Sequence, residues 1–326
     1  MTRRSVPALL VLVLAVFSFA CHAQKSNSVP HVGYLSAYPS KADLRLEVFR
    51  QQLRDLGHTE GKTFVIDHAS AEGQYGKLAS LAAELTRRQV NVIVADGGTA
   101  PTLAAIKATR TIPIVFCCVS NPVEQGMVAS LARPGGNVTG VTNQNSEFTP
   151  KLLQLLKEVF PSSKRFAALT NPNNPSLVLV VDELVRGAGA LGLSLTVVPA
   201  GGPDEFEKAF GEIAKLRPAA VLIIQDPILT AAAAQLAALA AQHGLTVSGG
   251  DIVAERGGLL SYGPNLLDLV RRAAIMTDKV LKGAKPSDLP VEQPNKLDLV
   301  INLKTARALG IRLPPPVLAR ADKVIE

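Results

Sequence analysis

The sequence is poor in residue types that carry metal binding, disulfide frameworks and nucleic-acid recognition. Its 326 residues include 5 His, 3 Cys and no Trp, and only 4% are aromatic. The histidines are dispersed without the spacing of metal ligands, so we expect neither a metal nor another cofactor. The net charge is +7, but basic residues are scattered and are not interleaved with aromatic side chains. We therefore expect no nucleic-acid partner.

Recognisable catalytic motifs are also missing. The sequence has no Gly-x-Ser-x-Gly elbow and no Ser/His/Asp set with a known local context. Residues 57–63 resemble a phosphate-binding loop, and residues 187–192 match a dinucleotide-binding fingerprint. Each follows a predicted helix and leads into a predicted strand, which reverses the order that these motifs require. We interpret their glycines as helix ends and turns, and we expect no enzyme activity.

The N-terminus has the three zones of a secretory signal peptide, which we predict over residues 1–23. Positive charge in the first four residues precedes an apolar run over 6–19 and then small residues. The run is shorter than the roughly 20 residues that span a membrane, and no later segment is long and apolar enough. These features predict a periplasmic protein. Cleavage before Cys21 would instead make a lipoprotein, although Ser18 and Phe19 fit a lipidation pattern poorly.

Once the signal peptide is removed, the only cysteines are Cys117 and Cys118, which are adjacent in an apolar run typical of a strand. Successive side chains of a strand point to opposite faces, so the two thiols are predicted to be unable to bridge. The simplest interpretation is that they are small hydrophobic residues. A catalytic nucleophile is the alternative, with no histidine nearby in the sequence.

From residue 29 onward, short apolar runs alternate with segments of helical period. A strand over 31–35 is followed by a helix over 43–56, and the same alternation continues to a last helix over 123–132 and a strand. A second block of similar length and order begins near residue 149. The pattern predicts an α/β protein with two similar, doubly wound parallel-sheet lobes, which suits a chain of this length.

Ligands of doubly wound folds bind at the carboxyl ends of the strands, and small or polar residues gather at those positions here. Gly98 and Thr99 precede a predicted helix and are suited to a ligand carboxylate. Asp226 is suited to a ligand amino group, and Tyr262 would form an aromatic wall. The same residue types also cap helices and shape turns, so that alternative stays open. The predicted polar contacts are Ser36, Gly98, Thr99, Ser120, Asn121, Asn173 and Asp226.

Ordered segments throughout the mature chain resemble ABC-type substrate-binding proteins labelled as tryptophan/tyrosine transport proteins. The strongest match is Leu-Ala-Arg-Pro-Gly-Gly-Asn-Val-Thr-Gly-Val at residues 131–141. The resemblance implies a type I periplasmic-binding fold, in which hinge crossovers join two lobes around a ligand. Other matching segments are 33–36, 81–85, 112–116, 171–175, 257–263, 289–294 and 299–306.

The resemblance also implies where the chain divides. An N-terminal lobe would contain residues 29–141 and about 264–290, and a C-terminal lobe residues 142–262 and about 291–326. The three crossovers between them are expected near residues 140–143, 261–264 and 290–294, and their Gly and Pro residues suit hinges as well as turns.

The expected function is that of an extracytoplasmic solute-binding protein of an ABC importer. It would capture a small molecule, such as an amino acid or another small carboxylate, and deliver it to the permease and ATPase at the inner membrane. We expect a monomer. One alternative is a periplasmic sensing receptor, which its neighbouring genes would reveal. A periplasmic enzyme using Cys117 or Asp226 is a second, and turnover of the ligand would reveal it.

Overall fold

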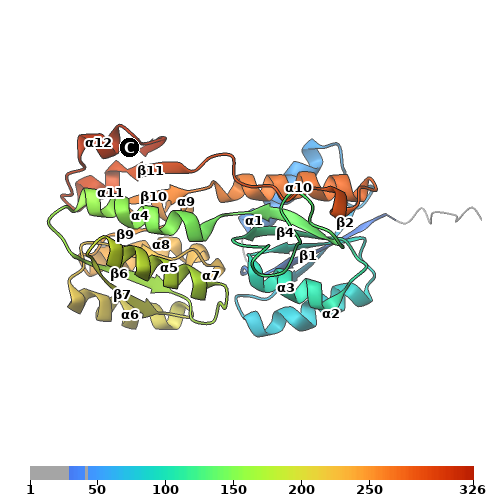
Figure 1. Cartoon of the computed structure of the whole chain (residues 1–326), viewed down its shortest axis with the longest axis horizontal. Helices are drawn as coiled ribbons and strands as arrows, with labels where there is room; N and C mark the ends of the chain where they lie inside the picture. The colour runs from blue at the N-terminus through green and yellow to red at the C-terminus, as the bar shows by residue number, and fades with distance from the viewer. Residues whose placement is uncertain (1–28, 41–42) are drawn as a thin grey trace, which may run out of the picture.

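The computed structural model describes residues 29–40 and 43–326, so the predicted signal peptide and Cys21 lie outside the described residues. The chain forms two α/β lobes that lie end to end (Figure 1). The sheet of the first lobe is entirely parallel and has the strand order β2-β1-β3-β4-β5. Its strands are β1 (His31–Ser36), β2 (Val65–Ser70), β3 (Val92–Asp96), β4 (Ile114–Val119) and β5 (Val138–Thr142).

Helices cover both faces of this sheet, because strands β3 and β4 are apolar on both sides and buried throughout. Tyr34 and Phe49 pack ring to ring, with centroids 5.1 Å apart, on the face covered by α1 and α10. Leu35 and Ile93 belong to the opposite face, which α2 and α3 cover. These helices are α1 (Leu44–Asp55), α2 (Leu78–Arg87), α3 (Thr99–Ala108) and α10 (Leu266–Leu281).

The second lobe repeats the strand order of the first. Its order β7-β6-β8-β9 continues to β10 through a bridge between Gly249 and Ser261, and β11 and β12 extend the edge. The strands β6 to β10 thus correspond to β1 to β5. Only the pairing of β10 with β11 is antiparallel. The strands are β6 (Arg165–Thr170), β7 (Ser194–Pro199), β8 (Val221–Ile223), β9 (Val247–Ser248), β10 (Leu260–Gly263), β11 (Asp298–Asn302) and β12 (Lys323–Ile325).

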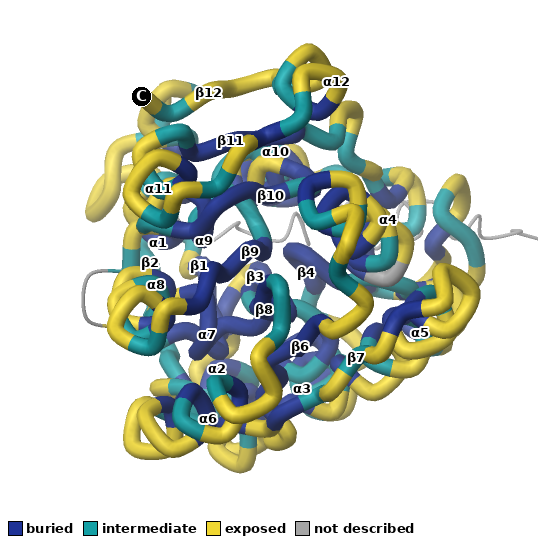
Figure 2. The backbone as a smooth tube through the Cα atoms, turned by 90° about the vertical axis from the view of Figure 1, so that its left-hand side faces the viewer, coloured by how far each residue is buried: buried dark blue, intermediate teal, exposed yellow. Residues whose placement is uncertain are grey.

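The second sheet is also covered on both faces, so its central strands are buried, while the edge strands β7 and β12 and the outer faces of the helices are exposed (Figure 2). The two-lobed, doubly wound architecture predicted from the alternation is therefore confirmed. The remaining helices are α4 (Asn145–Val159), α5 (Leu177–Ala190), α6 (Pro203–Leu216), α7 (Pro227–Ala231), α8 (Ala233–Gln242), α9 (Asp251–Glu255), α11 (Leu303–Ala308) and α12 (Pro315–Leu318), with short 3-10 turns η1 (Tyr75–Lys77) and η2 (Pro286–Asp288).

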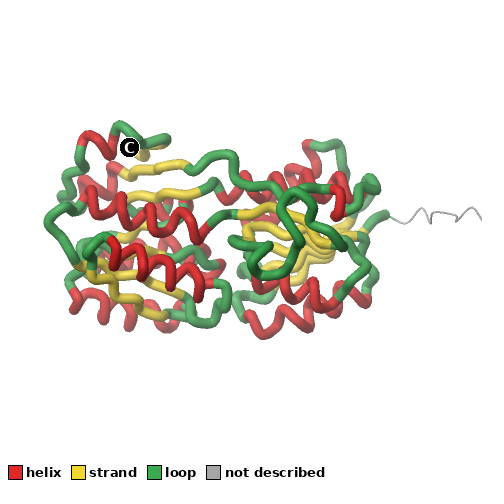
Figure 3. Tube along the Cα trace, viewed as in Figure 1, coloured by secondary structure: helices red, strands yellow, loops and turns green. Residues whose placement is uncertain are grey.

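The chain passes between the lobes three times, and loops make these connections (Figure 3). They lie between β5 and α4, between β10 and α10, and between η2 and β11. The third connection begins after Glu292, whose N–H still donates to the Gly140 carbonyl of the first sheet at 2.9 Å. Within residues 29–40 and 43–326, no helix combines the length and the apolar composition that crossing a membrane requires.

The helix predicted over 123–132 is wrong. This segment forms a series of turns, in which Gly126 adopts a φ of 66° and the N–H groups of Met127 and Val128 share the Pro122 carbonyl. A left-handed glycine interrupts a helix after a single turn. The apolar side chains that suggested a helical stripe are nevertheless buried, because the turns press Met127 and Val128 against the sheet.

Candidate functional site

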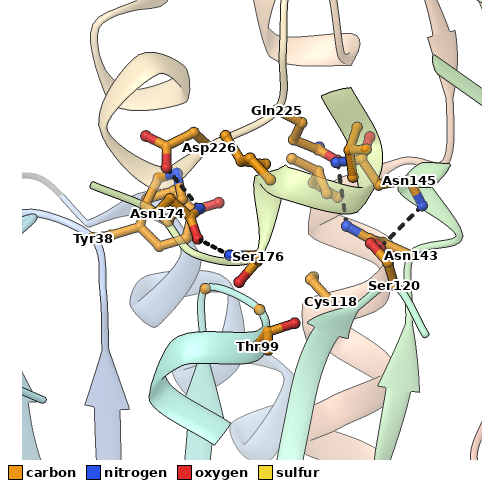
Figure 4. A pocket seen from close by; sticks show the side chains of 16 residues that line it. Tyr38, Thr99, Cys118, Ser120, Asn143, Asn145, Asn174, Ser176, Gln225 and Asp226 are labelled. Atoms are coloured by element: carbon orange, nitrogen blue, oxygen red, sulfur yellow. Dashed lines mark hydrogen bonds between the residues drawn. The ribbon is translucent and has the colours of Figure 1, made fainter. Parts of the chain in front are cut away.

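A pocket lies between the lobes, where the carboxyl ends of the two sheets face each other (Figure 4). The space left in this arrangement is only about 30 Å³, room for about two water molecules, so an amino acid could enter only when the lobes move apart. The first lobe lines it with Tyr38, Gly98, Thr99, Cys118 and Ser120, and the second with Asn174, Ser176, Leu177, Val180, Gln225 and Asp226. Asn143 of the first connection, Asn145 at the start of α4, Gly97, Pro227 and Leu266 also line it.

Four of the predicted site residues line this pocket, namely Gly98, Thr99, Ser120 and Asp226. The other four lie outside its lining. Ser36 is fully buried and its hydroxyl accepts from the Tyr38 N–H at 3.0 Å, while Asn121 donates to Glu124 at 2.9 Å. Asn173 is exposed, and Tyr262 packs against the core of the second lobe. Ligand contact by these eight residues stays a prediction.

The N-terminus of α3 forms the floor of the pocket. Gly97 and Gly98 turn the chain sharply out of β3 with φ values of 105° and 92°, a conformation that only glycine adopts easily. A Cβ on Gly97 would come within 2.8 Å of the Ala37 side chain, so the turn is also close-packed. Because no side chain caps α3, its first N–H groups and the buried Thr99 are available to an anionic group.

Asp226 is the most densely hydrogen-bonded residue of the pocket wall. Its buried carboxylate caps α7 by accepting from Ile228 N–H at 2.8 Å and Leu229 N–H at 3.2 Å. It also accepts from the amides of Asn171 at 3.1 Å and Asn174 at 2.8 Å, and from a tyrosine hydroxyl. A ligand amino group would have to displace some of these donors, so the carboxylate serves first to hold the wall in shape.

That hydroxyl belongs to Tyr75 of the first lobe, which reaches across to Asp226 of the second at 2.6 Å. Burial and the nearby Asp226 carboxylate raise the pKa of Tyr75 well above its usual value, so the phenol remains a donor. A second contact joins the Asn143 amide to Gln225 at 3.4 Å. A Cβ on Gly73 would overlap Ile228 of the opposite lobe. The lobes therefore touch around the pocket in a closed arrangement.

A buried ion pair supports the first-lobe side of the pocket. The Arg45 Nε donates to Asp96 at 2.8 Å, Nη2 makes a second bond to the same carboxylate, and Tyr34 donates to it at 2.9 Å. The Arg45 guanidinium also lies 4.7 Å from the centroid of the Tyr38 ring. Arg45 and Tyr75 could not be identified from the sequence, because each bonds to a residue far away along the chain and no local motif marks either position.

The predicted orientation of the two cysteines is wrong. Their Sγ atoms are 2.8 Å apart, on the same side of β4. Cys118 has a φ of 69°, and the pairing of β4 with β5 shifts register between Cys117 and Val119. This left-handed residue breaks the alternation of side chains on which the prediction depended. Cys118 consequently lines the pocket beside Thr99.

Two parallel-sheet lobes that close on a polar pocket, and that the chain connects three times, define a two-lobed solute-binding protein. A family model described as ABC transporter substrate binding protein matches residues 40–325. The chain belongs to this family, as its resemblance predicted, and the fold class and function predicted from the sequence are confirmed. The family implies a small-molecule ligand and the membrane components of an ABC transporter as partners.

Several relatives with known names or structures are similar to this chain over most of its length. A tyrosine-binding protein from Clostridioides difficile is 28% identical over 289 residues, covering 86% of this chain and 80% of that protein. The structure of an ABC domain in complex with L-Trp from Streptococcus pneumoniae is 26% identical with a TM-score of 0.81, over 91% of this chain and 100% of the other. A conserved domain protein from Vibrio cholerae is 28% identical with a TM-score of 0.81, at the same coverage.

Proposed function

We propose that this substrate-binding protein captures an aromatic L-amino acid between its lobes. The observation that carries the proposal is the polar pocket between the facing strand ends, in a chain whose relatives include a tyrosine-binding protein and a domain complexed with L-Trp. The predicted signal peptide supports export to the periplasm, where the protein would act as a non-catalytic monomer. Most of its pocket residues are polar groups that can hold a molecule by hydrogen bonds.

The polar and apolar parts of the pocket suit the two ends of such a ligand. The uncapped N-terminus of α3 and the Thr99 hydroxyl would hold the carboxylate. Ser120 donates to Asn143 at 3.0 Å and keeps oxygen lone pairs that can accept from the ammonium group. The side chain would lie against apolar residues, of which Leu177, Val180 and Leu266 are buried in the wall.

Thermal unfolding of the chain beginning at Gln24 tests the proposal against a panel of amino acids, nucleobases, sugars and small carboxylates. At about 100 times its Kd, a compound that binds only the folded state stabilises it by about 2.7 kcal/mol. We expect a saturable rise in Tm with L-tryptophan or L-tyrosine. A rise with sugars or nucleobases alone would contradict the proposed ligand class, and recovery of a chemically altered compound would contradict the non-catalytic role.

A matched pair of variants locates the site. Thr99→Val removes the hydroxyl at the α3 N-terminus and should weaken binding by about tenfold or more, the effect of losing one hydrogen bond to a charged group. Thr111→Val makes the same change at an exposed position of the same lobe and should leave binding unchanged. Equal affinities for the two variants in calorimetry would place the ligand elsewhere.

A further inference from the structure

Cys117 and Cys118 form a vicinal dithiol at the end of β4, and ligand capture as proposed above makes no use of thiol chemistry. Their Sγ atoms are 2.8 Å apart, close enough for one sulfur to reach the other with little movement. Cys117 is only 1% exposed, while Cys118 is 8% exposed and lines the pocket. The pair is thus shielded from the protein surface, and an external molecule could reach it only through the space between the lobes when they move apart.

A buried positive charge lies against both sulfurs. The Arg45 Nη2 is 3.2 Å from the Cys118 Sγ and 3.5 Å from the Cys117 Sγ. Burial opposes ionisation of Cys118, but the hydrogen bond with Cys117 and the charge of Arg45 together lower its pKa. Burial raises the pKa of the Cys117 thiol. The two thiols are therefore unequal, and Cys118 is the better nucleophile.

The same surroundings disfavour a metal ion. Ligand atoms of Asp96, Cys117 and Cys118 lie within 4.8 Å of one another, which resembles an incomplete metal site. However, both oxygens of the Asp96 carboxylate already accept from the guanidinium of Arg45. A metal cation would be repelled by the Arg45 charge and would have to displace Arg45 from Asp96, whereas a thiolate is stabilised by the same charge.

We propose that Cys117 and Cys118 are a reversible redox site, which an external disulfide such as glutathione disulfide converts to a vicinal disulfide. The Cys118 thiolate attacks one sulfur of the external disulfide, whose S–S bond breaks and releases one thiolate. Cys117 passes its proton to that thiolate and attacks the Cys118 Sγ, which releases the second thiolate to take a proton from solvent. The dithiol loses two electrons, and the external disulfide is reduced to two thiols.

Such a bond would be labile and would hold no part of the fold together. Neighbouring Cα atoms are about 3.8 Å apart, whereas ordinary disulfides join Cα atoms about 4.4–6.8 Å apart. Strained disulfides are more easily reduced than structural ones, and they are the regulatory type. Because Cys118 lines the pocket, the chemical state of the pair changes the wall that a ligand meets.

Mass spectrometry of the chain beginning at Gln24, which has no other cysteine, tests the proposal. The reduced protein is incubated with glutathione disulfide, denatured and treated with an alkylating reagent. We expect a mass lower by two hydrogens, no bound glutathione and no alkylation, with dithiothreitol restoring both thiols. A glutathione adduct that persists, or two thiols that remain free to alkylate, would overturn the proposal.

Two single variants test which thiol attacks. Cys117→Ser should accumulate the mixed disulfide of Cys118 with glutathione, because no second thiol can resolve it. Cys118→Ser leaves only the deeply buried Cys117, so its rate of reaction with glutathione disulfide should be lower by at least about tenfold. Equal rates would refute the role of Cys118. Circular dichroism checks that each variant folds, and the experiment on the unmodified chain stands without them.

Protection by a ligand tests whether the pocket is the route of entry, and this arm rests on the proposed function. A saturating concentration of L-tryptophan should slow oxidation at least about tenfold, because closure over the ligand keeps the external disulfide out. If L-tryptophan is shown to bind yet leaves the rate unchanged, entry through the pocket is wrong. If neither L-tryptophan nor L-tyrosine binds, the proposed function is at fault, and the oxidation of the free chain still tests the redox site.

Discussion

The hydrogen bond between Tyr75 and Asp226 should act as a latch between the lobes, and Tyr75→Phe removes it with little other change. The bond joins a neutral hydroxyl to a carboxylate at 2.6 Å, across 151 residues of sequence. A bond of this kind contributes about 1.5–3 kcal/mol. Asp226 keeps four other donors in the variant, so no buried charge is left without partners.

The latch exists only where the lobes meet, so its loss should weaken ligand binding rather than folding. When the lobes of the unliganded chain are mostly open, the full free energy of the lost hydrogen bond is subtracted from ligand binding. The Kd for L-tryptophan or L-tyrosine in calorimetry should then rise about 10- to 150-fold. The free energy of unfolding of the unliganded protein should change by less than about 1 kcal/mol.

Thr111→Val is the control, because Thr111 is an exposed residue of the first lobe that does not line the pocket. Its Kd should equal that of the unmodified chain. The latch is refuted if Tyr75→Phe binds as tightly as Thr111→Val, or if its unliganded form loses several kcal/mol of stability, since either result means that the bond does not depend on closure.

Further predictions concern stability. Burial raises the pKa of Asp251 to about 6, above the ordinary value of about 3.9, so between these pH values the folded state binds more protons than the unfolded state. The free energy of unfolding should fall by about 3 kcal/mol across that window as pH rises, and Asp251→Asn should remove this contribution to the pH dependence. Burial also raises the pKa of Asp43 to about 6, so the contribution of Asp43 to the pH dependence should remain in the variant. Gly140→Ala places a Cβ on the Phe116 carbonyl and should cost about 2–3 kcal/mol in urea unfolding, whereas Gly189→Ala, in open space on α5, should stabilise by about 0.5–1 kcal/mol.

The lobes, their sheets and most helices could be predicted because periodic apolar residues determine them locally. Helix α1, which was predicted over residues 43–56, buries Leu46, Phe49 and Leu53 at helical spacing. The same logic failed over residues 123–132, where Gly126 adopts a left-handed conformation that a hydrophobic pattern does not encode.

The pocket was predicted only in part, for a related reason. Gly98 and Thr99 could be found because a glycine turn after a strand is a local signal. Arg45 and Tyr75 could not, since each is defined by a partner far away in sequence, at Asp96 and Asp226. Backbone conformation also determines the orientation of the two cysteine side chains, because a positive φ at Cys118 brings together two thiols that an ideal strand would separate.

Equilibrium dialysis of the chain beginning at Gln24 against isotopically labelled L-tryptophan and L-tyrosine measures capture of an aromatic amino acid itself. We expect saturable binding of one intact amino acid per chain, with affinity reduced by Thr99→Val and unchanged by Thr111→Val. Binding that neither saturates nor responds to Thr99→Val, or no retention of either amino acid, would contradict the capture of an aromatic amino acid between the lobes.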